Sequence, residues 1–233
     1  MQPPSLSYPK RNRLQKALYF GSKHLLGLTG HIPSPWKTGH EVDGRPVLLI
    51  HNPKAAGSSL KALIGATGTT HSMPRLILSE RAWRAHYIIL SVRHPFDRFL
   101  SGYSFFVGGK HTGTLWRAHG AALRQMDPFE FLEFIKQYPE KLGPQVNWGL
   151  YPSAAKPRAD LILKVEESAN WPEQLRQAGL TVSAAEVPQL NNSRPTGLWA
   201  NGVLGLAPEE TQRLKAQVEA YFAADYESFG YRP

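Results

Sequence analysis

A lysine, a glycine and two serines lie close together in the stretch HNPKAAGSSL, and these residue types suit the binding of a phosphate or sulfate. The lysine offers a mobile ammonium, the glycine permits close backbone approach, and the serines add hydroxyl donors. If a helix begins here, its unpaired N–H groups and its dipole also favour an anion. An ordinary capped turn with a solvated lysine is the alternative. The proposed anion-binding loop comprises Lys54, Ala55, Ala56, Gly57, Ser58 and Ser59.

The order of residues in this loop differs from that of a Walker A motif. In that motif the lysine directly follows the second glycine, whereas Lys54 precedes Gly57. A second stretch, SVRHPFDRFLSGY, places Arg93 directly after an apolar run and Ser101 about two turns into a helix that begins near Pro95. Because open α/β sheets bind ligands at the carboxyl ends of their strands, we expect Arg93 and Ser101 to hold a second phosphate.

Elements that could position these residues follow from the apolar pattern. Short buried strands are predicted at 47–51, 86–92 and 161–165, and helical spacing follows each of them. Further helices are predicted from Asp127 to about Gln137 and from near Pro208. Strands that alternate with helices indicate an α/β fold with a central parallel sheet flanked by helices.

The chain divides into a basic N-terminal arm, residues 1–30, and one domain, residues 31–233. Residues 31–46 are rich in Pro, Gly and His, so we expect them to lead into a globular fold that begins at Val47. The segment 108–120 is glycine-rich, basic and aromatic, which predicts a mobile loop over the site.

The net charge of +9 favours anionic partners, and the absence of cysteine excludes a disulfide-stapled module. The apolar run of the arm is interrupted by Lys23 and His24, so no transmembrane helix is expected. The arm is interpreted as an amphipathic helix that packs on the domain, with peripheral membrane contact as the alternative.

Taken together, the two motifs resemble those of the carbohydrate-type sulfotransferases, which use 3′-phosphoadenosine 5′-phosphosulfate (PAPS). The likeness extends through Gln145, DLILKVEE with Glu166, VPQLNNS and YFAADYESFGY. Members commonly have threonine near Ala55 and asparagine or aspartate in place of His94. The resemblance implies a P-loop-like three-layer fold, with the first motif on the 5′-phosphosulfate and Arg93 and Ser101 on the 3′-phosphate. It also places Asn191 and Ser193 near the nucleotide.

Sulfuryl transfer needs an in-line nucleophile and fixed positive charge around a loose transition state. In this scheme Lys54 and Arg93 supply that charge, no metal is required, and adenosine 3′,5′-bisphosphate is the product. The segment THSMPR contains the favoured general base, His71, with a surface loop histidine as the alternative reading. His51 and His94 are interpreted as strand-end and helix-start residues with satisfied hydrogen bonds. Glu166 is expected to anchor a basic side chain.

The expected acceptor is a hydroxyl on a carbohydrate or glycoconjugate, and the expected setting is the cytoplasm of a bacterium. Two alternatives stay open. A P-loop nucleotide kinase predicts dependence on ATP and magnesium, although no Walker B carboxylate is evident. A non-catalytic nucleic-acid-binding protein predicts salt-sensitive binding, but the basic residues form no dense tract.

Overall fold

The centre of the computed structural model is a four-stranded sheet with strand order β1-β2-β3-β4. The strands are β1 (Lys37–Val42), β2 (Arg45–Ile50), β3 (Tyr87–Val92) and β4 (Leu161–Lys164). β2, β3 and β4 run parallel, as the sequence predicted, and β1 pairs antiparallel with β2. The described residues are 36–66, 71–108, 114–149, 159–184, 186–187 and 203–233, together with residues 14, 17, 18 and 21.

The edge strand β1 lies in a stretch that we expected to precede the fold, so the predicted start at Val47 is wrong. Asp43 and Gly44 both have positive φ, at 50° and 71°, and they form the tight turn between β1 and β2. Asp-Gly is typical of such hairpin turns because its backbone twist matches that of the strands. Trp36, just before β1, is fully buried, and the folded unit therefore includes this hairpin.

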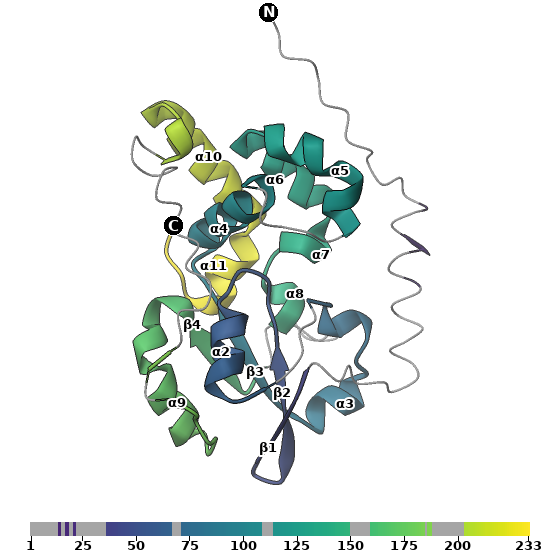
Figure 1. The fold of residues 1–233 in the computed structure, drawn as a ribbon, viewed down its shortest axis with the longest axis vertical. Helices are drawn as coiled ribbons and strands as arrows, with labels where there is room; N and C mark the ends of the chain where they lie inside the picture. Colours follow the sequence, from purple (N-terminus) through teal and green to yellow (C-terminus); the bar gives the residue numbers. More distant parts are fainter. Residues whose placement is uncertain are drawn as a thin grey trace, which may run out of the picture.

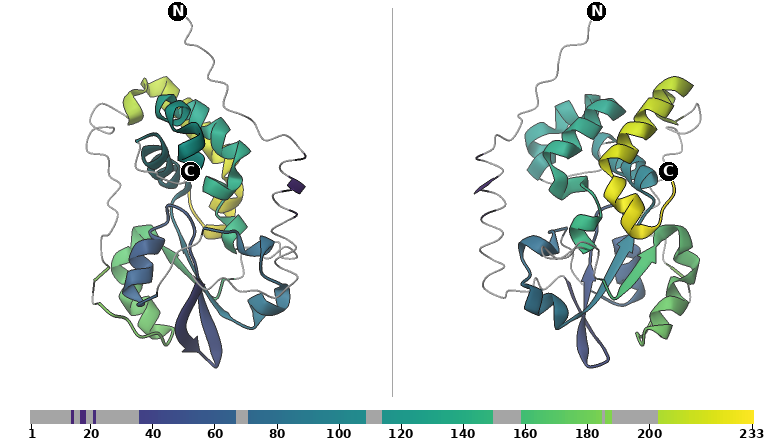
Figure 2. Two further views of the ribbon diagram at one scale, coloured as in Figure 1. Left: turned by 45° about the vertical axis from the view of Figure 1, so that its right-hand side comes forward. Right: turned by 180° about the vertical axis from the view of Figure 1, so that it is seen from behind.

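Helices cover both faces of the sheet (Figure 2). One face packs against α2 (Gly57–Leu63) and α9 (Trp171–Gln177). The other packs against η2 (Pro74–Leu76), α3 (Glu80–Arg84), α8 (Val146–Gly149) and α11 (Ala223–Phe229). Alternate residues of β2 enter the two cores, because successive side chains of a strand point to opposite faces.

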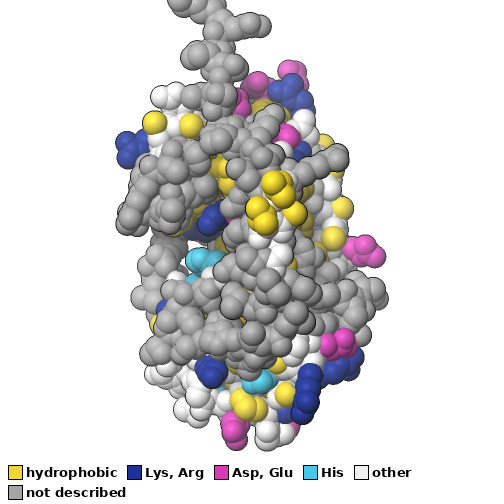
Figure 3. All heavy atoms as spheres, turned by 90° about the vertical axis from the view of Figure 1, so that its right-hand side faces the viewer, with side chains coloured by type: hydrophobic (Ala, Val, Ile, Leu, Met, Phe, Trp, Pro, Cys, Tyr) yellow, Lys and Arg dark blue, Asp and Glu magenta, His cyan; other side chains and the backbone are white. Residues whose placement is uncertain are grey.

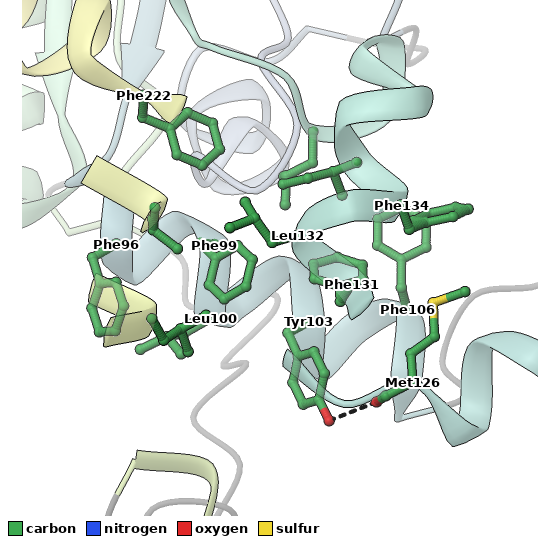
Figure 4. Packing of buried hydrophobic residues seen from close by; sticks show 14 of the residues in the cluster. Phe96, Phe99, Leu100, Tyr103, Phe106, Met126, Phe131, Leu132, Phe134 and Phe222 are labelled. Carbon is green, nitrogen blue, oxygen red and sulfur yellow. Dashed lines mark hydrogen bonds between the residues drawn. The ribbon is translucent and has the colours of Figure 1, made fainter. Parts of the chain in front are cut away.

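A layer of helices lies beyond the ends of β2 and β3 (Figure 1). It consists of α4 (Pro95–Val107), α5 (Thr114–Gln125), α6 (Pro128–Gln137), α7 (Pro139–Leu142) and α10 (Pro208–Tyr221). Its core is aromatic: the ring of Phe131 lies 5.5 Å from the rings of both Phe99 and Tyr103 (Figure 4). The Tyr103 hydroxyl donates to the Met126 carbonyl at 2.9 Å. This layer holds α4 in place, and the N-terminal part of α4 belongs to the second motif.

The start of α6 confirms the prediction at Asp127. Its carboxylate accepts from the N–H groups of Phe129 and Glu130, and the Glu130 carboxylate accepts from the Asp127 N–H, which completes a capping box. By contrast, the loop predicted over 108–120 is wrong from Thr114 onward, where α5 begins. Alanine, leucine, arginine and glutamine predominate there, and their helix propensity outweighs the glycine.

Leu14 and Leu18, in the N-terminal arm, are helical and remain 66% and 63% exposed. These two leucines therefore do not pack on the domain, contrary to the favoured interpretation of the arm. Within the part of the chain that the structure describes, no helix has both the length and the apolar character needed to cross a bilayer.

Phe131 tests the aromatic core of the helical layer. Phe131→Ala removes a fully buried ring and should lower the free energy of unfolding by about 3–5 kcal/mol, because a cavity remains. The matched change Phe129→Ala, at a half-buried position of the same helix, should cost clearly less. Urea unfolding monitored by circular dichroism measures both, and equal losses would contradict the assigned core.

Candidate anion-binding site at the carboxyl ends of the strands

The loop between β2 and α2 folds into a compact turn. The Asn52 N–H donates back to the Ile50 carbonyl at 3.1 Å, and Lys54 and Ala56 adopt left-handed backbone angles with φ of 64° and 53°. Such angles are strained for residues with a Cβ and persist only where the surroundings hold them. No described side chain caps α2 at Ala56, so the first-turn N–H groups face out of the helix toward the loop.

Lys54 points from this loop toward α4. Its ammonium lies 4.3 Å from the ring centroid of Phe105, which follows Ser101 by one helical turn. Ser101 is 5% exposed, and its hydroxyl has no hydrogen-bond partner within the described residues. A buried hydroxyl without a partner costs about 1–3 kcal/mol, so a ligand oxygen at this position would remove a penalty. The structure thus brings the predicted Lys54 and Ser101 to the same side of α4.

Arg93 directly follows β3, and its backbone is held by the fully buried side chain of Gln145. The Arg93 N–H donates to Gln145 Oε1 at 2.9 Å, and Gln145 Nε2 donates to the Arg93 carbonyl at 2.7 Å. The same Oε1 accepts from Asn52 Nδ2 at 2.9 Å, and that amide also donates to the Ser91 carbonyl. Since β2 and β3 are parallel neighbours, their carboxyl ends lie side by side. The Lys54 loop and the segment that starts at Arg93 leave the sheet there, and they are linked through Asn52 and Gln145.

Arg98, on α4, is fully buried and joins the same network. Its guanidinium donates to the Pro53 carbonyl at 2.8 Å, to Asn52 Oδ1 at 3.0 Å and to the Gly143 carbonyl at 2.9 Å. Burial lowers the pKa of Arg98 to about 10, so the group stays charged at neutral pH. The network therefore carries a positive charge inside the protein.

Asp225, on α11, provides the negative charge of the network. Its two carboxylate oxygens accept from the N–H groups of Gln145 and Val146 at 2.8 and 2.9 Å. Burial raises the pKa of Asp225 to about 6, while the charge of Arg98 and these hydrogen bonds act in the opposite direction. The carboxylate is thus predominantly ionised at pH 7 and holds the turn that presents Gln145.

Neither Arg98 nor Asp225 was predicted to be functional. With a helical period of about 3.6 residues, Arg98 falls on the side of α4 opposite to Phe96 and Phe99, so the apolar pattern places it toward solvent. The available signal is at Asp225, which lies among aromatic residues in the last helical segment, where a charge is unusual unless it is paired.

His71 lies beside the anion-binding loop. Its ring centroid is 4.4 Å from that of His51, in an edge-to-face arrangement, and its carbonyl accepts from Trp148 Nε1 at 3.1 Å. The His51 ring packs so closely on Gly57 that a Cβ there would collide with it. His71 itself is exposed. Histidine side chains reach the surface on the face of the molecule that Figure 3 shows.

His51 differs from its expected role. Its Nδ1 is buried without a hydrogen-bond partner in the described structure, so the expected hydrogen bond is not made at this nitrogen. Burial, with smaller contributions from His71 and Lys61, lowers the pKa of His51 to about 3. At neutral pH this ring is therefore uncharged.

His94 and Glu166 have structural roles near the second motif. The His94 N–H donates to Glu166 Oε1 at 2.7 Å, and the His94 ring bonds the Arg232 carbonyl at 3.1 Å, which confirms the interpretation of His94. Glu166 was expected to anchor a basic side chain. It instead accepts from that backbone N–H and from the Tyr231 hydroxyl at 3.0 Å. The C-terminal segment is thereby tied to the start of α4.

Asn191 and Ser193, predicted to lie near the nucleotide, fall outside the described residues. Among the residues that are described, no three acidic or histidine side chains gather in a way that could hold a metal ion. Comparison with protein-family models, with curated proteins and with solved structures finds no match.

Arg98→Met should lower the free energy of unfolding by about 3–5 kcal/mol, because it leaves the carboxylate of Asp225 buried without its counter-charge. Asp225→Asn should relieve part of this penalty. In a double-mutant cycle measured by urea unfolding, the double variant should lose less stability than the sum of the single variants. Additive losses would show that the two charges act independently.

The folded-state pKa of His51 is depressed to about 3, so unfolding takes up a proton in the window between that value and the usual 6.5. Stability should therefore fall as pH is lowered through this window, by about 2 kcal/mol from this group between pH 7 and pH 5. His51→Gln should show a correspondingly smaller loss. Unfolding curves at the two pH values measure the difference, and parallel losses in both proteins would contradict the burial of a neutral ring.

Proposed function

We propose that the protein is a sulfotransferase that moves a sulfuryl group from PAPS to an acceptor hydroxyl, with a P-loop-like arrangement at the donor site. The single observation that carries the proposal is the coupling of two anion-binding loops. Arg93 and the 53–59 loop follow adjacent parallel strands and are linked through Gln145 and Asn52. A ligand with two phosphate groups some distance apart would engage both loops at once.

The residues present fit such a donor. PAPS carries about four negative charges, and Lys54, Arg93 and the N–H groups at the start of α2 supply complementary positive charge. We assign the 5′-phosphosulfate to the loop containing Lys54 and the 3′-phosphate to Arg93 and Ser101. The buried Ser101 hydroxyl, which lacks a partner in the described residues, gains one in this assignment.

In the proposed reaction the acceptor oxygen attacks sulfur in line with the bond to the 5′-phosphate. As the new sulfur–oxygen bond forms, the old one breaks, and its electron pair remains on the phosphate of adenosine 3′,5′-bisphosphate. Lys54 neutralises the charge that develops on this phosphate, and His71 takes the proton of the acceptor hydroxyl. The exposure of His71 is compatible with an acceptor that enters from solvent. A carbohydrate hydroxyl is the proposed acceptor class.

A thermal-shift experiment tests this function against its alternatives. A ligand that binds only the folded state raises the melting temperature, so adenosine 3′,5′-bisphosphate should stabilise the protein. A larger shift with ATP and magnesium would instead support a nucleotide kinase. A salt-sensitive shift with an oligonucleotide alone would support nucleic-acid binding. Absence of any shift with the bisphosphate would overturn the proposed function.

Single substitutions distinguish the residues proposed to bind the donor from the residue proposed to act in sulfuryl transfer. Lys54→Ala, Arg93→Ala and Ser101→Ala should each weaken bisphosphate binding by about tenfold or more, since each removes a hydrogen bond to a charged group. Arg84→Ala, which removes an exposed ion pair with Glu80, serves as the matched control and should leave binding unchanged. His71→Ala should retain binding and abolish transfer to sugar acceptors, measured with sulfur-labelled donor.

A further inference from the structure

The side chain of Gln145 holds the backbone of Arg93 in the way that a neighbouring strand would. It accepts from the Arg93 N–H at 2.9 Å and donates to the Arg93 carbonyl at 2.7 Å. A two-point contact of this kind fixes both the position and the direction of the chain where Arg93 leaves β3. The Cα of Arg93, from which its side chain extends, is therefore held in a fixed position at the carboxyl end of β3.

The same amide oxygen reaches the first loop. Gln145 Oε1 accepts from Asn52 Nδ2 at 2.9 Å, and Asn52 precedes Pro53 and Lys54. Gln145 is fully buried, and its own N–H donates to the buried Asp225 carboxylate, so it sits on a fixed support. One side chain thus connects the two segments that carry the predicted anion-binding residues.

We propose that Gln145 is a positioning residue that sets Arg93 at the correct distance from the Lys54 loop, so that one ligand bridges both. This inference rests on the proposed function, since it assumes that the bridging ligand is a nucleotide with 5′- and 3′-phosphates. Gln145 need not touch the ligand. Its effect is on the gain in affinity that the second phosphate provides once the first is bound.

The test compares two probes, adenosine 5′-monophosphate and adenosine 3′,5′-bisphosphate, by calorimetric titration. The ratio of their dissociation constants measures what the 3′-phosphate contributes. In Gln145→Met, which keeps the length but removes the polar atoms, this ratio should fall about tenfold or more, while the Kd of the monophosphate should change by about threefold at most. Gln177→Met, on the exposed side of α9, is the control and should keep the wild-type ratio.

Gln145→Glu provides a second variant should the methionine variant fail to fold. It keeps the volume and the acceptor oxygen but sets a carboxylate oxygen against the Arg93 carbonyl in place of a donor, so the same ratio should also fall in this variant. An unchanged ratio, or equal weakening of both probes, in a folded variant would overturn the role of Gln145 and leave the proposed function intact. A wild-type protein that binds both probes equally would reject the proposed function itself, and the role of Gln145 with it.

Discussion

The buried guanidinium of Arg98 is the constraint on which the arrangement of the site depends. A charge inside a protein is strongly unfavourable unless hydrogen bonds and an opposite charge surround it. Arg98 meets this requirement with oxygens from Asn52, Pro53 and Gly143, which belong to segments far apart in sequence. Asp225, on α11, supplies the nearby negative charge and accepts from the N–H of Gln145, whose side chain accepts from Asn52, so the C-terminal helices are tied to the first loop through Gln145.

This constraint accounts for the strained backbone of the first loop. Lys54 and Ala56 adopt left-handed angles without the freedom of glycine, and the preceding Pro53 carbonyl is fixed by Arg98. The strain is tolerated because the network holds the residues on its N-terminal side and α2 holds those that follow. A loop held in this way can present its N–H groups to an anion with little reorganisation, which is the condition for strong electrostatic binding.

Continuous apolar runs predicted the strands β2, β3 and β4, which are buried on both faces, and helical spacing of apolar residues predicted the helices α4, α6 and α10. It missed β1, whose turn signal, Asp43-Gly44, stood among prolines and glycines that favoured a linker. It also missed the buried charges of Arg98 and Asp225. Arg98 lies on the side of α4 opposite to its apolar residues, and it is buried because Pro53, Asn52 and Gly143 meet it there, which depends on how distant segments come together and not on the local period.

The two halves of the site are built differently. On the side proposed for the donor, the backbone of Arg93 and the loop of Lys54 are tied to buried side chains, and Ser101 lies on a helix that the same network anchors. On the other side, His71 is exposed and is held through its carbonyl and through contact with the His51 ring. A rigid donor side suits a ligand whose phosphates never vary. If His71 is the base, as proposed, its place outside the network would allow the acceptor to change without disturbing the charges assigned to the donor.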